Sequence, residues 1–163
     1  MFREMRRKRQ QTSAEEAQRI LESQTSGVLA LSGDDGYNYA VPISYAVDGD
    51  RIYFHSALSG HKLDSIRRND RVSFCVIAQD EIVPERFTTY FKSAIAFGRM
   101  RIIIDDDDPE KRHGLELLMD KYSPTVGADE RDKEMSKMKA CAVPVLDIEH
   151  LTGKVAKELV TKK

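Results

Sequence analysis

Residues 27–55, GVLALSGDDGYNYAVPISYAVDGDRIYFH, decide the fold. Three runs within this stretch, at 28–31, 39–47 and 51–55, are either continuously apolar or alternate with period two, as strands do. Asp35-Gly36 and Asp48-Gly49 stand between them, and an Asp-Gly step supplies the positive φ angles that a tight hairpin turn requires. The stretch therefore predicts three strands joined as an antiparallel meander.

Similar runs beyond this stretch predict more strands. They lie at 71–78, 93–104 and 142–148, and a loop at 84–90 precedes the second of them. Pro42 interrupts the strand at 39–47 and cannot donate a hydrogen bond to a ladder. It therefore implies a sheet edge, a bulge or a point where another molecule meets the backbone. The expected architecture is mainly β, a six-stranded antiparallel small barrel with peripheral helices.

Four helices are expected around this barrel. Ser13 followed three residues later by Glu16 forms a capping box at the start of the first. A second is expected over about 60–68, Pro109 opens a third, and the charged stretch 128–139 forms an exposed fourth. The apolar faces of the first and third helices are formed by Ala17, Ile20 and Leu21, and by Leu115, Leu118, Met119 and Tyr122.

Length and charge limit the classes of protein. The 163 residues suit one domain, with a solvated basic leading tail at 1–12 and a C-terminal tail at 155–163. The 26 basic and 27 acidic residues give a net charge of -1, which argues against nucleic acid as a partner. No apolar run approaches the ~18 residues of a membrane span, and the chain opens on Met1-Phe2-Arg3-Glu4 without a signal core. We expect a cytoplasmic protein.

Metal and hydrolase chemistry find little support. Cys75 and Cys141 form no CxxC pair and are expected to be reduced core thiols. His113 and His150 stand alone among charged residues, and no Cys/His cluster has zinc-ligand spacing. The four consecutive Asp residues at 105–108 fan around a turn, so a solvated segment at a helix N-terminus is favoured over a metal site.

One loop suits an anion. Ser59 is the expected N-cap of the second helix, which makes Gly60, His61 and Lys62 its first-turn residues. Their backbone N–H groups have no partner inside the helix and lie at its positive end, while His61 and Lys62 add side-chain donors. His55 and Ser56, just before this loop, could donate to the same phosphate. An ordinary capped helix with a surface Lys and a packed His fits the residues equally well.

Several motifs in order resemble the pyridoxamine 5'-phosphate oxidase-like split-barrel flavoproteins, most closely the nitroimidazole-resistance branch. They are Gly27-Val28-Leu29-Ala30, Val41-Pro42-Ile43-Ser44-Tyr45, Ile52-Tyr53-Phe54-His55-Ser56-Ala57 with Gly60-His61-Lys62-Leu63, Phe87-Thr88-Thr89-Tyr90 with Ser93-Ala94-Ile95-Ala96-Phe97-Gly98, and Asp147-Ile148-Glu149-His150-Leu151-Thr152-Gly153-Lys154.

The resemblance implies an FMN-binding split barrel that forms a homodimer, with FMN in a groove between two barrels. Val41, Pro42, Ile43 and Ser44 would meet the isoalloxazine edge. The implied phosphate clamp consists of His55, Ser56, Gly60, His61 and Lys62, and residues Thr88, Thr89, Tyr90 and Ser93 would approach from the partner subunit.

The chain departs from true pyridoxamine-phosphate oxidases. His61-Lys62 stands where they have an Arg-Lys pair, and the chain has no Trp to match their C-terminal region. The resemblance therefore implies a flavin reductase acting on nitro compounds or another small electron acceptor, with no catalytic residue assigned; His55 and Tyr90 are candidates for proton transfer. The alternatives are a non-catalytic FMN- or haem-binding sensor or store, with His61 or His55 as haem ligand, and a deazaflavin-binding barrel.

Overall fold

An antiparallel sheet of eight strands dominates residues 2–160, the part of the chain that the structure, a computed structural model, describes. Its neighbours follow the order β2-β1-β6-β7-β8-β4-β3, and β5 pairs separately with β8. The strands are β1 Ser26–Ser32, β2 Asn38–Ser44, β3 Ala46–Asp48, β4 Arg51–Tyr53, β5 Ser56–Ala57, β6 Arg71–Val83, β7 Thr88–Ile103 and β8 Cys141–Val155. The helices are α1 Ala14–Ser23, α2 His61–Arg68, α3 Pro109–Tyr122 and α4 Ala128–Lys137.

The predicted meander is confirmed in part: its two antiparallel hairpins, β1–β2 and β3–β4, are present, but its middle strand is not continuous. The run predicted at 39–47 divides at Tyr45 into β2, which pairs with β1, and β3, which pairs with β4. These two pieces lie at opposite ends of the strand order. With the short strand β5, this division turns the six predicted strands into eight. The sheet is not closed by pairing between β2 and β3, and the fold is the expected split barrel.

The division occurs where the Tyr45 side chain enters the core, with none of its surface exposed. Its ring meets Phe74 edge-on, with centroids 4.7 Å apart, and Phe74 meets Phe54 in the same way at 5.2 Å. These aromatic rings lie at the centre of the main cluster of buried residues, which also takes in Ile20 and Leu21 of α1. The barrel therefore fills with side chains instead of enclosing a ligand.

Both turns follow the Asp-Gly prediction. At the first, the Tyr37 N–H donates to the Asp34 carbonyl at 3.0 Å, and Asp35 and Gly36 have φ angles of 54° and 82°. Gly49 in the second turn has φ 58°. The two successive positive φ angles of the first turn are those of a type I′ turn, which matches the twist of the flanking strands.

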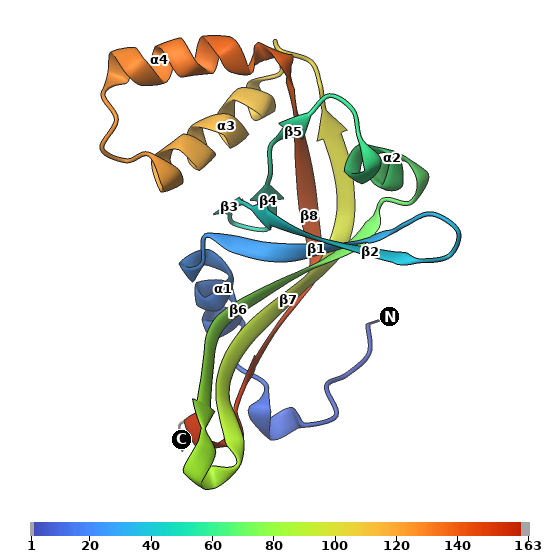
Figure 1. Cartoon of the computed structure of the whole chain (residues 1–163), viewed down its shortest axis with the longest axis vertical. Helices are drawn as coiled ribbons and strands as arrows, with labels where there is room; N and C mark the ends of the chain where they lie inside the picture. The colour runs from blue at the N-terminus through green and yellow to red at the C-terminus, as the bar shows by residue number, and fades with distance from the viewer. Residues whose placement is uncertain (1, 161–163) are drawn as a thin grey trace.

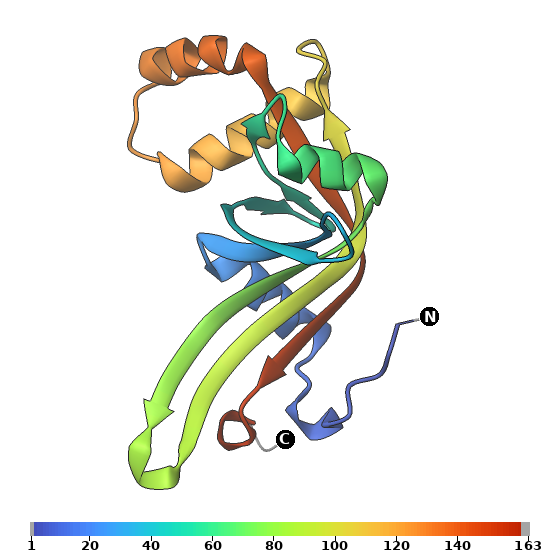
Figure 2. The same cartoon turned by 45° about the vertical axis from the view of Figure 1, so that its right-hand side comes forward.

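The helices α1 and α3 begin where the sequence predicts. The Ser13 hydroxyl accepts a hydrogen bond from the Glu16 N–H at 3.2 Å, and Ala17, Ile20 and Leu21 are buried. The Asp108 carboxylate accepts from the Glu110 N–H at 2.8 Å and starts α3. In Figures 1 and 2, α3 and α4 lie at one end of the molecule, and the β6–β7 hairpin projects from the other. No helix in the described residues is long and apolar enough to cross a membrane.

The leading tail is not simply solvated. Gln10 is 6% exposed, and the Thr12 N–H donates to the Gly153 carbonyl of β8 at 3.0 Å. Phe2 stacks on His150 with centroids 4.7 Å apart. The tail docks because this half of β8 has a free edge on which Gln11 bridges to Lys154. At the other terminus, residues 161–163 of the predicted tail lie outside the described residues.

The prediction of two core thiols holds in part for Cys141, which packs against the second cluster of buried residues, and not for Cys75, which packs against neither cluster. Cys75 and Cys141 are free thiols, and both are only partly buried. Partial burial is still enough to raise the pKa of each thiol. Strand alternation explains the position of Cys75, because an apolar run on a one-sided sheet sends every second residue to the outer face.

Gly98 lies at a register shift between β7 and β8, where no side chain fits. A Cβ there would overlap the Asp147 carbonyl oxygen, 2.9 Å from the carbonyl carbon. We expect Gly98→Ala to lower the free energy of unfolding by about 1–3 kcal/mol, because the two strands must separate. Gly127→Ala is the control, since a Cβ there meets nothing within 4 Å. Urea denaturation of both variants checks this, and equal stabilities would contradict it.

Candidate functional site

The edge strand β2 presents alternate residues to opposite sides. Val41 and Ile43 are half-buried and pack against the core, whereas Pro42 and Ser44 are exposed. Pro42 lies opposite Val28 of β1, and β2 ends the strand order, so the edge position implied by Pro42 is confirmed. The side of β2 away from β1 is thus available to another molecule.

Pro42 opens onto what we call the outer face, the side of the sheet turned away from the core. Register places its residues in rows: Val28 opposite Cys75, Cys75 opposite Ile95, and Ile77 opposite Ser93. The row of pairs continues along the β6–β7 hairpin with Ile82 opposite Thr89. Val28, Ile77 and Ile82 are 40%, 60% and 74% exposed. The half of the outer face toward the hairpin tip therefore carries three exposed apolar side chains, with Asp80 and Lys154 on the same face.

The four residues implied to reach a partner subunit divide between two faces. Thr89 and Ser93 lie on the outer face by strand alternation, while Thr88 and Tyr90 point to the other side of the hairpin. The Tyr90 hydroxyl accepts a hydrogen bond from Arg86 Nη1 at 2.9 Å. Only Thr89 and Ser93 share a surface with Val28 and Ile77.

The anion loop begins its helix one residue later than predicted. The N-cap of α2 is Gly60, not Ser59, and no side chain makes a capping hydrogen bond there. Gly60 has φ 132°, a backbone conformation that residues with a Cβ rarely adopt, and nothing lies within 4 Å of its missing Cβ. Because the chain turns into the helix at Gly60, the N-cap lies at this residue and not at the predicted Ser59. His61 and Lys62 remain in the first turn.

His61 is held by the β1–β2 hairpin. Its ring stacks on Tyr39 with centroids 4.2 Å apart, and its Nε2 lies 3.3 Å from Asp34 Oδ2. Arg68 Nη1 lies 2.6 Å from the other oxygen of Asp34, and this hydrogen bond lowers the pKa of the carboxyl. The hairpin turn is thereby tied to both ends of α2.

Lys62 and His55 are the unpaired side chains of the predicted clamp. Among residues 2–160, neither makes a hydrogen bond or an ion pair, whereas His61 makes one to Asp34. Ser56 is positioned by β5, in which it pairs with Ala142 of β8. The structure thus holds the loop by its backbone and leaves the Lys62 and His55 side chains available to a ligand.

Sequence reasoning missed the contacts that hold the β2–β3 junction. The Tyr122 hydroxyl accepts from the Tyr45 N–H at 2.9 Å, and it lies 2.8 Å and 2.5 Å from the Tyr45 and Thr25 carbonyls, which share its single proton as acceptors. Lys121 Nζ donates to the Gln24 carbonyl at 2.6 Å and lies 4.1 Å from the centre of the Tyr45 ring. Burial lowers the pKa of Lys121 and raises that of Tyr45.

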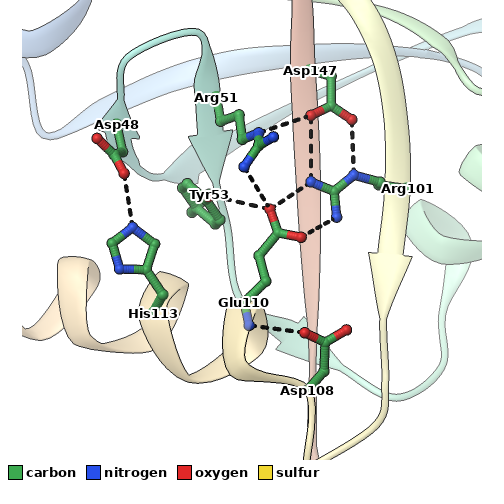
Figure 3. A network of polar contacts seen from close by, with 8 residues as sticks. All are labelled: Asp48, Arg51, Tyr53, Arg101, Asp108, Glu110, His113 and Asp147. Carbon is green, nitrogen blue, oxygen red and sulfur yellow. Dashed lines mark hydrogen bonds and ion pairs between the residues drawn. The ribbon is translucent and has the colours of Figure 1, made fainter.

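A charged network fixes the start of α3 to the sheet (Figure 3). Arg101 of β7 contacts both oxygens of Glu110 at 2.6 Å, and its Nε donates to Asp147 at 2.8 Å. Arg51 lies 3.4 Å from each of the same two carboxylates, and the Tyr53 hydroxyl donates to Glu110 at 3.2 Å. The hydrogen bonds to Arg101 lower the pKa of Glu110.

The comparisons with known proteins place the fold in a family. The family model described as pyridoxamine 5'-phosphate oxidase matches residues 13–155. The chain therefore belongs to the pyridoxamine 5'-phosphate oxidase family, as its motifs predicted. No curated protein sequence matches the chain.

Several solved structures share this fold. A proposed 5-nitroimidazole antibiotic resistance protein from Bacteroides thetaiotaomicron is 22% identical, with a TM-score of 0.72 over 88% of this chain and 84% of that one. An FAD-binding protein from Mesorhizobium loti is 26% identical, with a TM-score of 0.63 over 90% and 96%. An FAD- and haem-binding protein from Mycobacterium smegmatis is 21% identical, with a TM-score of 0.70 over 94% and 77%.

Removal of the Tyr122 hydroxyl should loosen the β2–β3 junction. Tyr122→Phe leaves the Tyr45 N–H without its partner, and an unsatisfied buried donor costs about 1–3 kcal/mol of unfolding free energy. Tyr37→Phe is the matched control, because the Tyr37 side chain is 78% exposed. Urea denaturation measures both, and a Tyr122→Phe variant as stable as its control would exclude a role for the hydroxyl.

The lowered pKa of Glu110 predicts how the stability of the fold changes at acid pH. Because its folded pKa lies below the ordinary 4.5, the ionised carboxylate stabilises the fold above that pH, and this stabilisation disappears as the pH falls through the folded pKa. Glu110→Gln should therefore be less stable than the natural protein at neutral pH, with a difference that shrinks in acid. Urea midpoints at several pH values measure this. Glu130→Gln, on the exposed face of α4, should show no such trend.

Proposed function

We propose that the protein is an FMN-binding flavoprotein, an oxidoreductase that reduces nitro compounds or another small electron acceptor. The observation that carries the proposal is that two features lie on neighbouring elements of a pyridoxamine 5'-phosphate oxidase-family chain, since Tyr39 of β2 stacks on His61 of α2. An exposed edge strand carries Pro42 and Ser44, and the first turn of α2 carries the unpaired Lys62. The relatives named for FAD support a flavin as the cofactor.

The anion loop fits the phosphate of such a cofactor. The free N–H groups of the first turn of α2 lie beside Lys62, and Gly60 allows close approach because no side chain covers its backbone. His55 adds a donor from the end of β4. His61 contributes less freely than the sequence implied, because it is engaged by Asp34 and Tyr39.

The β2 strand fits the ring system. Backbone groups alternate along an antiparallel strand, so Val41 and Ile43 bond to β1 whereas Pro42 and Ser44 face the free edge. The Pro42 carbonyl and the Ser44 N–H and carbonyl can bond to the polar rim of an isoalloxazine, with Val41 and Ile43 holding the strand in place. Bound flavin would supply the electron-transfer chemistry, and the chain would bind and orient it. We assign no proton-transfer residue; His55 and Tyr90 remain the candidates from the sequence.

We place this site between two copies of the chain. Val28, Ile77 and Ile82 form an exposed apolar strip on the outer face, and a sheet face of this kind is favourable to bury against a second copy. Thr89 and Ser93 lie beside that strip and would reach the partner's flavin. We further propose one domain over residues 1–163 and a cytoplasmic setting, which suits the free thiols Cys75 and Cys141.

The haem alternative has one specific difficulty. A haem ligand needs an accessible imidazole nitrogen, but the His61 ring is stacked on Tyr39 and its Nε2 faces Asp34. The protein of M. smegmatis named for FAD and haem keeps this alternative open through His55. The set of Gly60, Lys62 and free N–H groups favours the flavin phosphate.

Lys62 provides the direct test of the phosphate clamp. Lys62→Ala should weaken FMN binding ~10- to 100-fold, because a charge-assisted bond to phosphate is worth about 1.5–3 kcal/mol. Riboflavin, which lacks the phosphate, should bind the natural protein and the variant equally. Quenching of flavin fluorescence measures all four affinities.

Lys137→Ala is the matched control, because Lys137 lies on α4 in an exposed pair with Glu134. It should bind FMN as the natural protein does. A Lys62→Ala variant that is folded and has unchanged FMN affinity would remove Lys62 from the clamp. If FMN and riboflavin bind the natural protein equally, there is no phosphate site.

A further inference from the structure

A groove of about 770 Å³ lies on the outer face, on the side of the β1–β2 turn. Phe2, Ala30, Ser73 and Phe97 line one end, and Asn38, Arg71 and Arg99 line the other. Its polar end contrasts with the apolar strip of Val28, Ile77 and Ile82. The outer face thus has a half with exposed apolar side chains, suited to a second copy, and a hollow, charged half.

The groove begins close to the strand proposed to hold the flavin. Ala30 pairs with Ala40 of β2 on one side and with Ser73 of β6 on the other. Ala40 and Pro42 face the same side and are two residues apart, which is about 7 Å along a strand. A ligand over Ala30 and Ser73 would therefore be a near neighbour of a ring held at Pro42. The inference below rests on that proposed flavin site.

One end of the groove has aromatic walls. The ring of Phe2 lies 5.7 Å from Phe97 and stacks on His150 at 4.7 Å with an interplanar angle of 8°. Phe97 lies opposite both Ser73 and His150 in the sheet. The small side chains of Ala30 and Ser73 leave room beside these rings. This end suits a flat aromatic group, which gains from stacking as well as from burial.

The other end carries one unpaired cation. Arg99 is occupied, since its Nη1 contacts the two oxygens of Asp70 at 3.0 Å and 2.9 Å and its Nε contacts Glu149 at 3.2 Å. The Arg71 guanidinium, directly across from Arg99, makes no hydrogen bond or ion pair with residues 2–160. The Glu149 carboxylate also lines the groove, but Arg99 offsets its charge. Arg71 is left to bind an anion.

We propose that this groove holds the second substrate, a planar aromatic compound that carries a carboxylate or a similar anionic group. Its ring lies against Phe97 and Phe2, and its anion pairs with Arg71, whose fork of N–H donors matches a carboxylate. The same groove discriminates against neutral aromatic compounds, because they leave the guanidinium without a partner.

The test compares para-nitrobenzoate with para-nitrobenzyl alcohol, two probes that differ in charge and share a ring. The FMN-loaded natural protein should bind the acid ~10-fold more tightly than the alcohol, as one charge-assisted contact provides. Arg71→Gln should bring the ratio close to one. Phe2→Ala should weaken both probes and keep the ratio, because it removes only the aromatic wall. Calorimetric titration measures each affinity.

The control variant is Arg67→Gln, since Arg67 is an exposed arginine paired with Asp64 on α2, outside the groove. It should retain the preference for the acid. Equal affinities for acid and alcohol in the natural protein, or a preference that survives Arg71→Gln, would overturn the inference. FMN affinity measured on the same samples separates the two proposals. Suppose that FMN fails to bind while the preference for para-nitrobenzoate still depends on Arg71. That result would contradict the proposed flavin site and support the groove as a site for anionic aromatic compounds.

Discussion

The hydrogen bonds between the Tyr122 hydroxyl and the backbone of Tyr45 are the constraint on which the rest of the structure depends. Tyr45 is where the chain leaves β2 at one edge of the sheet and enters β3 at the other, so its own N–H and carbonyl have no strand partner. The Tyr122 hydroxyl of α3 accepts from this N–H and lies within hydrogen-bond distance of this carbonyl, which shares its proton with the Thr25 carbonyl. The same hydroxyl and Lys121 reach the Thr25 and Gln24 carbonyls at the end of α1. One short segment thus joins α1, α3 and the split in the barrel.

This junction places the proposed site. Val41 to Ser44 directly precede Tyr45, so the fixed crossing sets how β2 meets the outer face. The β1–β2 turn is held in the same way, because Asp34 binds His61 and Arg68 of α2. The strand and the anion loop are therefore positioned against one another by polar contacts that involve neither Lys62 nor the exposed side of β2. Both remain available to a cofactor.

Much of this could be predicted from the sequence, because strand periodicity, Asp-Gly turns and helix caps are local signals. The fold class, the edge position of Pro42 and the starts of α1 and α3 follow from them. The crossing at Tyr45 could not be predicted, because the apolar pattern of residues 39–47 is the same for one continuous strand as for two strands divided at Tyr45. The docking of Gln11 on β8, the N-cap at Gly60 and the unpaired Arg71 depend on contacts between distant segments. Alternation could have placed Cys75 on the outer face, but only with the register known.

The central claim is that flavin binds between two copies of the chain. Sedimentation equilibrium of the FMN-loaded protein, followed at the visible absorption of the flavin, tests it most directly. The account predicts that the flavin sediments with the mass of two chains, at one FMN per chain. Flavin that sediments with a single chain would contradict the proposed interface, and flavin that remains unbound would contradict the site itself.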